Sequence, residues 1–117
     1  MANYDTKKCT PVAQGGVGES GASTLLVHQF NEKIRKKVVL QTVETSLCPN
    51  TGAIGVLVVN GESKAHGNLT ANGSSIETEV GPGETVIAIV HTIPLFNEIA
   101  CVRLGELTVE LLDCGPA

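Results

Sequence analysis

The stretch that decides the fold is SSIETEVGPGETVIAIVHT, residues 74–92. Its first part, residues 76–80, alternates Ile, Thr and Val with two glutamates, and this two-residue period is typical of a strand with one buried and one solvated face. After Gly81-Pro82-Gly83, residues 85–90 are apolar on both faces, as in a strand that is covered on both sides. The cover could come from the same domain or from a neighbouring chain, and the sequence leaves both open.

The composition favours an all-β fold. Of the 117 residues, 42% are hydrophobic but only 3% are aromatic, so the core must consist of Val, Ile and Leu, which suit pleated sheets. The 13 glycines and the repeated Asn-Gly steps favour turns between strands over helices. A chain of this length forms one domain.

Charge and hydropathy argue against two classes of partner. The formal net charge of −4 gives no electrostatic reason to bind nucleic acid or an anionic membrane. No apolar run approaches the ~20 residues that span a bilayer, and the N-terminal MANYDTKKC lacks the apolar core of a secretory signal. We therefore expect no nucleic acid and no membrane as partners, and a chain that is made in the cytosol or has already been processed.

About eight short strands follow one another at regular spacing between residues 24 and 113. Such a series is typical of a β-sandwich or jelly roll, in which two antiparallel sheets pack face to face. Residues 1–22 have no repeating apolar face, so we expect them to form a flexible connector arm, followed by a β domain of residues 23–117. The glycines that would act as the hinge of this arm are Gly15, Gly16, Gly18 and Gly21.

No group of residues has the pattern of an active site. His28 and His91 lie within strands, where a structural role is the usual one, and His66 lies in a polar loop without a second ligand at suitable spacing. Glu77 and Glu79 share a strand face, without sign of the apolar pocket that raises the pKa of a catalytic acid. We therefore expect no enzyme, and no catalytic, cofactor-binding or metal-binding residue.

A basic cluster holds four of the eight positive charges: Lys33, Arg35, Lys36 and Lys37. One interpretation is a solvated edge whose lysines discourage unwanted strand pairing. Another is a partner for carboxylates, such as those of residues 77 and 79, on an adjacent subunit.

Four cysteines lie too far apart in sequence for a CxxC zinc or redox motif. They could be inert core thiols, or they could form disulfides in any of three pairings. They are Cys9, Cys48, Cys101 and Cys114.

The pattern as a whole resembles the endospore appendage (Ena) subunits of spore-forming bacilli. The similar parts are an N-terminal arm with a cysteine, the run NGSSIETEVGPGETVIAIV (residues 72–90) and the final GELTVELLDC (residues 105–114). The resemblance implies an eight-stranded jelly roll with strands B to I in two sheets, B-I-D-G and C-H-E-F. The implied strands are B 24–30, C 36–47, D 53–60, E near Leu69, F 75–80, G 85–91, H 98–104 and I 107–113.

The resemblance further implies a structural subunit that self-assembles into disulfide-linked, pilus-like fibres on the endospore surface. Its partners would be copies of itself, together with anchor or tip proteins of the spore surface. It would be made in the cytosol of the sporulating mother cell and end up outside it. Because helical members of the family carry two adjacent cysteines in the arm and this chain has only Cys9 there, we expect the ring-stacked, ladder-type fibre.

The roles of single residues also follow from the resemblance. Cys9 would bond to Cys114 of a subunit in an adjacent ring, and Cys48 could bond to Cys101 within the domain. Strand G would be an exposed edge that pairs with strand C of the neighbouring subunit, since main-chain pairing at a sheet edge joins chains. The residues of this lateral contact would be Lys36, Lys37, Val39, Thr85, Ile87 and Ile89.

Two other classes of function compete with the fibre subunit. One is a monomeric jelly-roll binding module, or a phage capsid or decoration protein of the same fold. The other is a small metal enzyme in a cupin-like barrel, which the spacing of the histidines disfavours.

Overall fold

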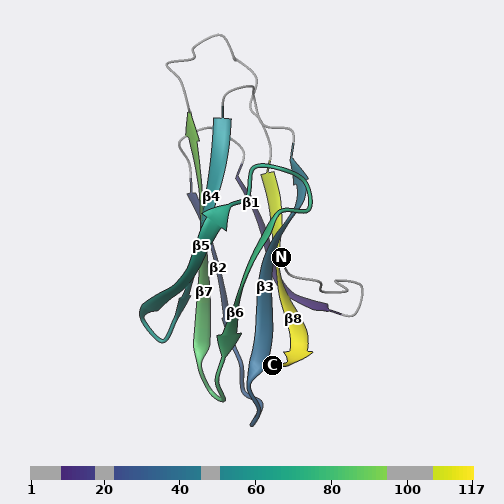
Figure 1. Cartoon of the computed structure of the whole chain (residues 1–117), viewed down its shortest axis with the longest axis vertical. Helices are drawn as coiled ribbons and strands as arrows, with labels where there is room; N and C mark the ends of the chain where they lie inside the picture. The colour runs from purple at the N-terminus through teal and green to yellow at the C-terminus, as the bar shows by residue number, and fades with distance from the viewer. Residues whose placement is uncertain (1–8, 18–22, 46–50, 95–106) are drawn as a thin grey trace.

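The structure, a computed structural model, describes residues 9–17, 23–45, 51–94 and 107–117. In these ranges it is all-β: eight strands form two four-stranded antiparallel sheets that pack as a sandwich, and no helix is present (Figure 1). None of the described residues belongs to a helix that could cross a membrane. The strands are β1 (Thr10–Val17), β2 (Ser23–Gln29), β3 (Lys36–Thr45), β4 (Thr51–Val59), β5 (Glu62–Asn68), β6 (Ser75–Val80), β7 (Thr85–Pro94) and β8 (Leu107–Pro116).

One sheet has the order β1-β8-β3-β6 and the other the order β2-β7-β4-β5. The chain crosses between the sheets at most connections, while β4 and β5 form a hairpin within one sheet. The hairpin turns at Asn60-Gly61, where both residues have positive φ (54° and 80°), as a two-residue type I′ turn requires.

The core lies between the two sheets and consists almost entirely of aliphatic side chains, as the composition predicts. Every second residue of the central strands contributes to it, because alternate side chains of a strand point to the same face of the sheet. Its main members are Val38 and Leu40 of β3, Leu57 and Val59 of β4, Val86, Ala88 and Val90 of β7, and Leu107, Val109 and Leu111 of β8.

The deciding stretch folds as two strands in opposite sheets, β6 and β7. The chain passes between them through a turn in which Gly83, at φ 76°, donates a backbone hydrogen bond to the Phe30 carbonyl at 2.8 Å. The core covers only one face of β7, while Ile87 and Ile89 on the other face stay half-buried. The sequence leaves open whether β7 is covered by its own domain or by a neighbouring chain. On one face of β7, the cover is the core of the same domain.

The prediction of an arm without strands is wrong for residues 10–17, which form β1. This strand pairs with β8 from Thr10 opposite Asp113 to Val17 opposite Leu107. A proline and two glycines give the segment TPVAQGGV a low strand propensity, so the pairing with β8 and the burial of Val17 decide its conformation.

The predicted hinge is wrong at Gly15 and Gly16, which are paired residues of β1. A Cβ atom at Gly15 would lie 2.7 Å from Leu26 Cδ2 of the opposite sheet, so this glycine permits close packing of the sheets. Gly18 and Gly21 lie outside the described residues.

The predicted sheet order is also wrong for the residues assigned to it. The strand predicted as B is β2, which pairs with β7 and not with the final strand β8. The strand predicted as C is β3, which lies between β8 and β6. The cause is the overlooked β1, because it moves the strands predicted as B to G one place along the series, whereas the strand predicted as I remains the last one, β8. Strand H was assigned to residues 98–104, which lie outside the described residues.

Candidate interaction site

A disulfide joins Cys9 to Cys114 within the chain, with 4.2 Å between the two Cα atoms. Cys9 directly precedes β1, and Cys114 lies near the end of β8, one residue beyond the Thr10–Asp113 pair. The bond therefore ties the start of β1 to its neighbour. These are the two cysteines that the resemblance pairs, but it implies a bond between subunits, and that bond stays a prediction. Cys48 and Cys101 lie outside the described residues.

The strands that end the two sheets are the places where further strands could add. In the described part of the chain, β1 and β6 are the edges of one sheet, and β2 and β5 are the edges of the other. An edge strand presents backbone N–H and C=O groups along its free side, which is a template for pairing with another chain.

The predicted lateral contact is not on these edges. Thr85, Ile87 and Ile89 belong to β7, which is paired on one side with β2 and on the other with β4. Lys36, Lys37 and Val39 belong to β3, which is paired with β8 and β6. The prediction that residues 85–91 form an edge strand is therefore wrong. Their apolar character on both faces reflects a central position in the sheet, which the same pattern also predicts.

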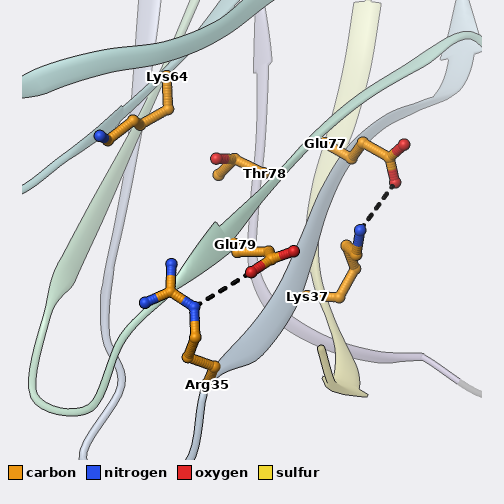
Figure 2. A pocket seen from close by; sticks show the side chains of 6 residues that line it. All are labelled: Arg35, Lys37, Lys64, Glu77, Thr78 and Glu79. Atoms are coloured by element: carbon orange, nitrogen blue, oxygen red, sulfur yellow. Dashed lines mark hydrogen bonds and ion pairs between the residues drawn. The ribbon is translucent and has the colours of Figure 1, made fainter.

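The carboxylates of β6 find their partners within the chain. In a shallow charged depression, Arg35 Nε lies 3.1 Å from Glu79 Oε1, and Lys37 Nζ lies 3.9 Å from Glu77 Oε2 (Figure 2). The interpretation that this basic cluster waits for carboxylates of an adjacent subunit is wrong for these two pairs. Both residues of the Arg35 pair are about half exposed, so the pair contributes at most about 1 kcal/mol.

Lys36 differs from the rest of the basic cluster because it is almost buried, at 8% exposed. Its Nζ lies 3.0 Å from Glu32 Oε1 and 3.2 Å from Asp113 Oδ2. The hydrogen bond to Glu32 raises the pKa of Lys36 above its usual value of 10.5; burial opposes the rise, and Asp113 adds to it. The side chain joins the start of β3 to the end of β8, next to Cys114.

The outer face of the three strands β2, β7 and β4 carries a group of aliphatic side chains, whereas β5 places Ser63 and His66 on the same face. Residues opposite one another in the ladders share a face, so Val27, Ile87 and Val58 form one row across three strands. Leu25, Ile89 and Val56 form the next row. The side chains on β2 are the most exposed: Leu25 is 62% exposed and Val27 57%. We call these six residues the apolar block. The sequence already indicates exposed apolar side chains on β2, because the run TLLV (residues 24–27) places apolar residues on both faces of the strand.

Two of the histidines have the structural contacts expected of them. His91 Nδ1 and Ser23 Oγ are 2.6 Å apart across the β2–β7 ladder. The ring of His28 packs edge-on against Phe30, with the ring centroids 4.7 Å apart. His66 is exposed on β5, a strand that the sequence places only as a brief strand near Leu69. Among the described residues, no group of three or more His, Cys, Asp and Glu is arranged to hold a metal ion.

Comparison with known proteins gives no family for the chain: a scan against protein-family models and a search of curated proteins both found no match.

Proposed function

We propose that this chain is a structural subunit that self-assembles through its sheet edges into disulfide-linked, pilus-like fibres. The observation that carries the proposal is that, in the described part of the chain, each sheet ends in a strand with one unpaired side: β6 in one sheet and β2 in the other. The two strands are of similar length. The resemblance to endospore appendage subunits extends the proposal to fibres on the spore surface.

The strand order supports a jelly roll as the finer description of the sandwich. When β1 is taken as strand B, the order β1-β8-β3-β6 corresponds to B-I-D-G, and β2-β7-β4-β5 corresponds to C-H-E-F. The lateral contact between strands G and C, which the resemblance implies, then involves β6 and β2. Both are edge strands, as strand addition requires.

Addition of β6 from one subunit to β2 of the next would join two four-stranded sheets into one. β6 has six residues and β2 has seven, so the two could pair over about their whole length. Main-chain hydrogen bonds would supply affinity, and the side chains along the joint would supply register.

The position of the disulfide supports the proposed covalent link between subunits. Cys9 lies beside Cys114 because β1 pairs with β8. If β1 of one subunit paired with β8 of another, the same local geometry would join two chains. β1 is suited to such an exchange because it is an edge strand and Val17 is its single fully buried side chain among residues 10–17.

The lateral contact can be tested by a substitution that places a charged side chain at the edge strand β6. Thr78 lies between the two glutamates of β6 and is half-buried at the rim of the sandwich (Figure 2). Because a lysine that points inward at a strand edge opposes pairing with another chain, we expect Thr78→Lys to abolish fibres in electron micrographs. The matched control is Thr108→Lys on the interior strand β8, which should still form fibres.

Fibres of normal length from Thr78→Lys would contradict strand addition at β6. The competing function, a monomeric binding module, is favoured by one observation: the disulfide and the pairing of β1 with β8 both lie within one chain. A wild-type chain that stays monomeric while it binds a foreign ligand would support this second function.

A further inference from the structure

We propose that β1 and β5 are protected edge strands, and that their irregular backbones confine strand addition to β2 and β6. In the described part of the chain, these four strands are the edges of the two sheets. This role rests on the proposed strand addition and gives it a direction. One edge of each sheet joins subunits, and the other edge is kept from joining.

The strand β5 carries a bulge at Lys64. Leu57 of β4 lies opposite Ala65, and the next residue, Val58, lies opposite Ser63, so Lys64 is an extra residue in this ladder. An extra residue of this kind bends the strand and increases its local twist. The Lys64 side chain is also charged and 43% exposed. A bulge and a lysine both keep an edge strand from pairing with another chain.

The strand β1 combines a bulge with a proline. Pro11 lies opposite Leu112 and Ala13 lies opposite Leu111, so Val12 is an extra residue in the pairing with β8. Pro11 has no backbone N–H that it could donate to a further strand. Proline and bulges occur at sheet edges, where both oppose pairing with another chain.

The strands β2 and β6 are regular by comparison. β2 pairs with β7 over Ser23–Gln29 and β6 pairs with β3 over Ser75–Val80, without a register shift in either ladder. Neither strand contains a proline or a lysine. The two glutamates of β6 form ion pairs within the chain. A regular edge of this kind can accept a further strand along its length.

The four edge strands lie in pairs along the two open sides of the sandwich. β1 lies beside β2 on one side, and β5 lies beside β6 on the other. Pairing of β6 with β2 of the next subunit therefore uses one strand from each side, and it leaves β5 and β1 next to the joint. Unprotected edges at these places would join neighbouring rows of subunits. The bulges thus restrict growth to a single row.

Deletion of Lys64 tests the protection of β5. The deletion makes Ser63 and Ala65 neighbours and keeps their pairs with β4, so the strand becomes regular. Two control variants have the same change in net charge. Lys64→Ser keeps the extra residue, and Lys33→Ser removes an exposed lysine outside the strands. Circular dichroism checks the fold of each variant.

The deletion variant should associate through β5. If wild-type chains form fibres, the fibres of this variant should lie side by side and be roughly twice as wide or more in electron micrographs, while both serine variants keep the wild-type width. If wild-type chains stay monomeric, which contradicts the proposed function, only the deletion variant should gain mass with concentration in sedimentation velocity experiments. The two readouts therefore separate a failure of this inference from a failure of the proposed function.

Two results would overturn the protection of β5. One is a deletion variant that folds and associates no more than wild type. The other is equal association of the deletion variant and Lys64→Ser, because the bulge would then have no effect.

The strand β1 supplies a second test, which does not depend on the folding of the β5 variants. Deletion of Val12 together with Pro11→Thr makes β1 regular and restores a backbone N–H at position 11. We expect this double variant to associate side by side, and the control Pro11→Thr, which keeps the extra residue, to do so roughly tenfold less. A folded double variant that behaves like the wild type would contradict the protection of β1.

Discussion

At the scale of single residues, Lys36 is a side chain whose position is fixed by its burial and by its ion pairs. It is nearly buried and contacts two carboxylates from different parts of the chain, Glu32 and Asp113. Hydrogen bonds to charged groups contribute roughly 1.5–3 kcal/mol each when they are well formed. We expect Lys36→Met to lower the free energy of unfolding at pH 8 by an amount in this range, measured by urea denaturation.

The pH dependence gives a second readout of the same residue. The pKa of Lys36 is raised in the folded chain, so its contribution to stability is complete below the unfolded pKa, near 10.5, and is lost as the pH rises through the higher folded value. The stability difference between wild type and Lys36→Met should therefore shrink above pH 10.5. A difference that stays constant up to pH 12 would contradict the contact with the two carboxylates.

Residue identity alone did not reveal what the glycines do. In the sequence, Gly15 and Gly16 look like hinge residues of a tether. In the structure, Gly15 faces Leu26 of the other sheet, where a Cβ atom would come too close, and both glycines are paired with β8. A glycine that avoids a clash and a glycine that gives flexibility look the same in sequence, because the distinguishing neighbour lies in a distant strand.

At the scale of the elements, β6 and β7 could be predicted because their side chains carry the information: a two-residue period in one and a continuous apolar run in the other. β1 could not, since its strand conformation depends on pairing with β8, about 100 residues later in the chain. β5 is mostly exposed and polar, and its place follows from the hairpin with β4. The six residues of the apolar block could be read as apolar, but the ladder register was needed to place them on one face.

The disulfide gives a prediction about the strand β1. An intrachain Cys9–Cys114 bond leaves monomers on a non-reducing denaturing gel, whereas exchange of β1 between subunits makes the same bond interchain. We expect assembled wild-type protein to give a ladder of multimers that collapses to monomer on reduction. The Cys9→Ser variant should give no ladder.

A control excludes the other two cysteines. The double variant Cys48→Ser, Cys101→Ser should keep the reducible ladder if Cys9 and Cys114 form the link. Multimers that survive in Cys9→Ser but disappear in the double variant would assign the link to Cys48 and Cys101 instead.

At the scale of the whole molecule, the sandwich has two kinds of unsatisfied surface. Among the described residues, the edge strands of the two sheets have a side without a neighbouring strand, and β2 carries two aliphatic side chains that are more than half exposed. The edge strands are the surfaces that the proposed strand addition would use. In the proposed fibre, pairing at the sheet edges would be used repeatedly.

The most direct test of self-assembly is negative-stain electron microscopy of the purified full chain, without any partner, over a range of concentrations in oxidising buffer. We predict long fibres of uniform width in this preparation, and their absence in the Thr78→Lys variant. Single compact particles at every concentration, with the Cys9–Cys114 bond intact within each chain, would contradict the account.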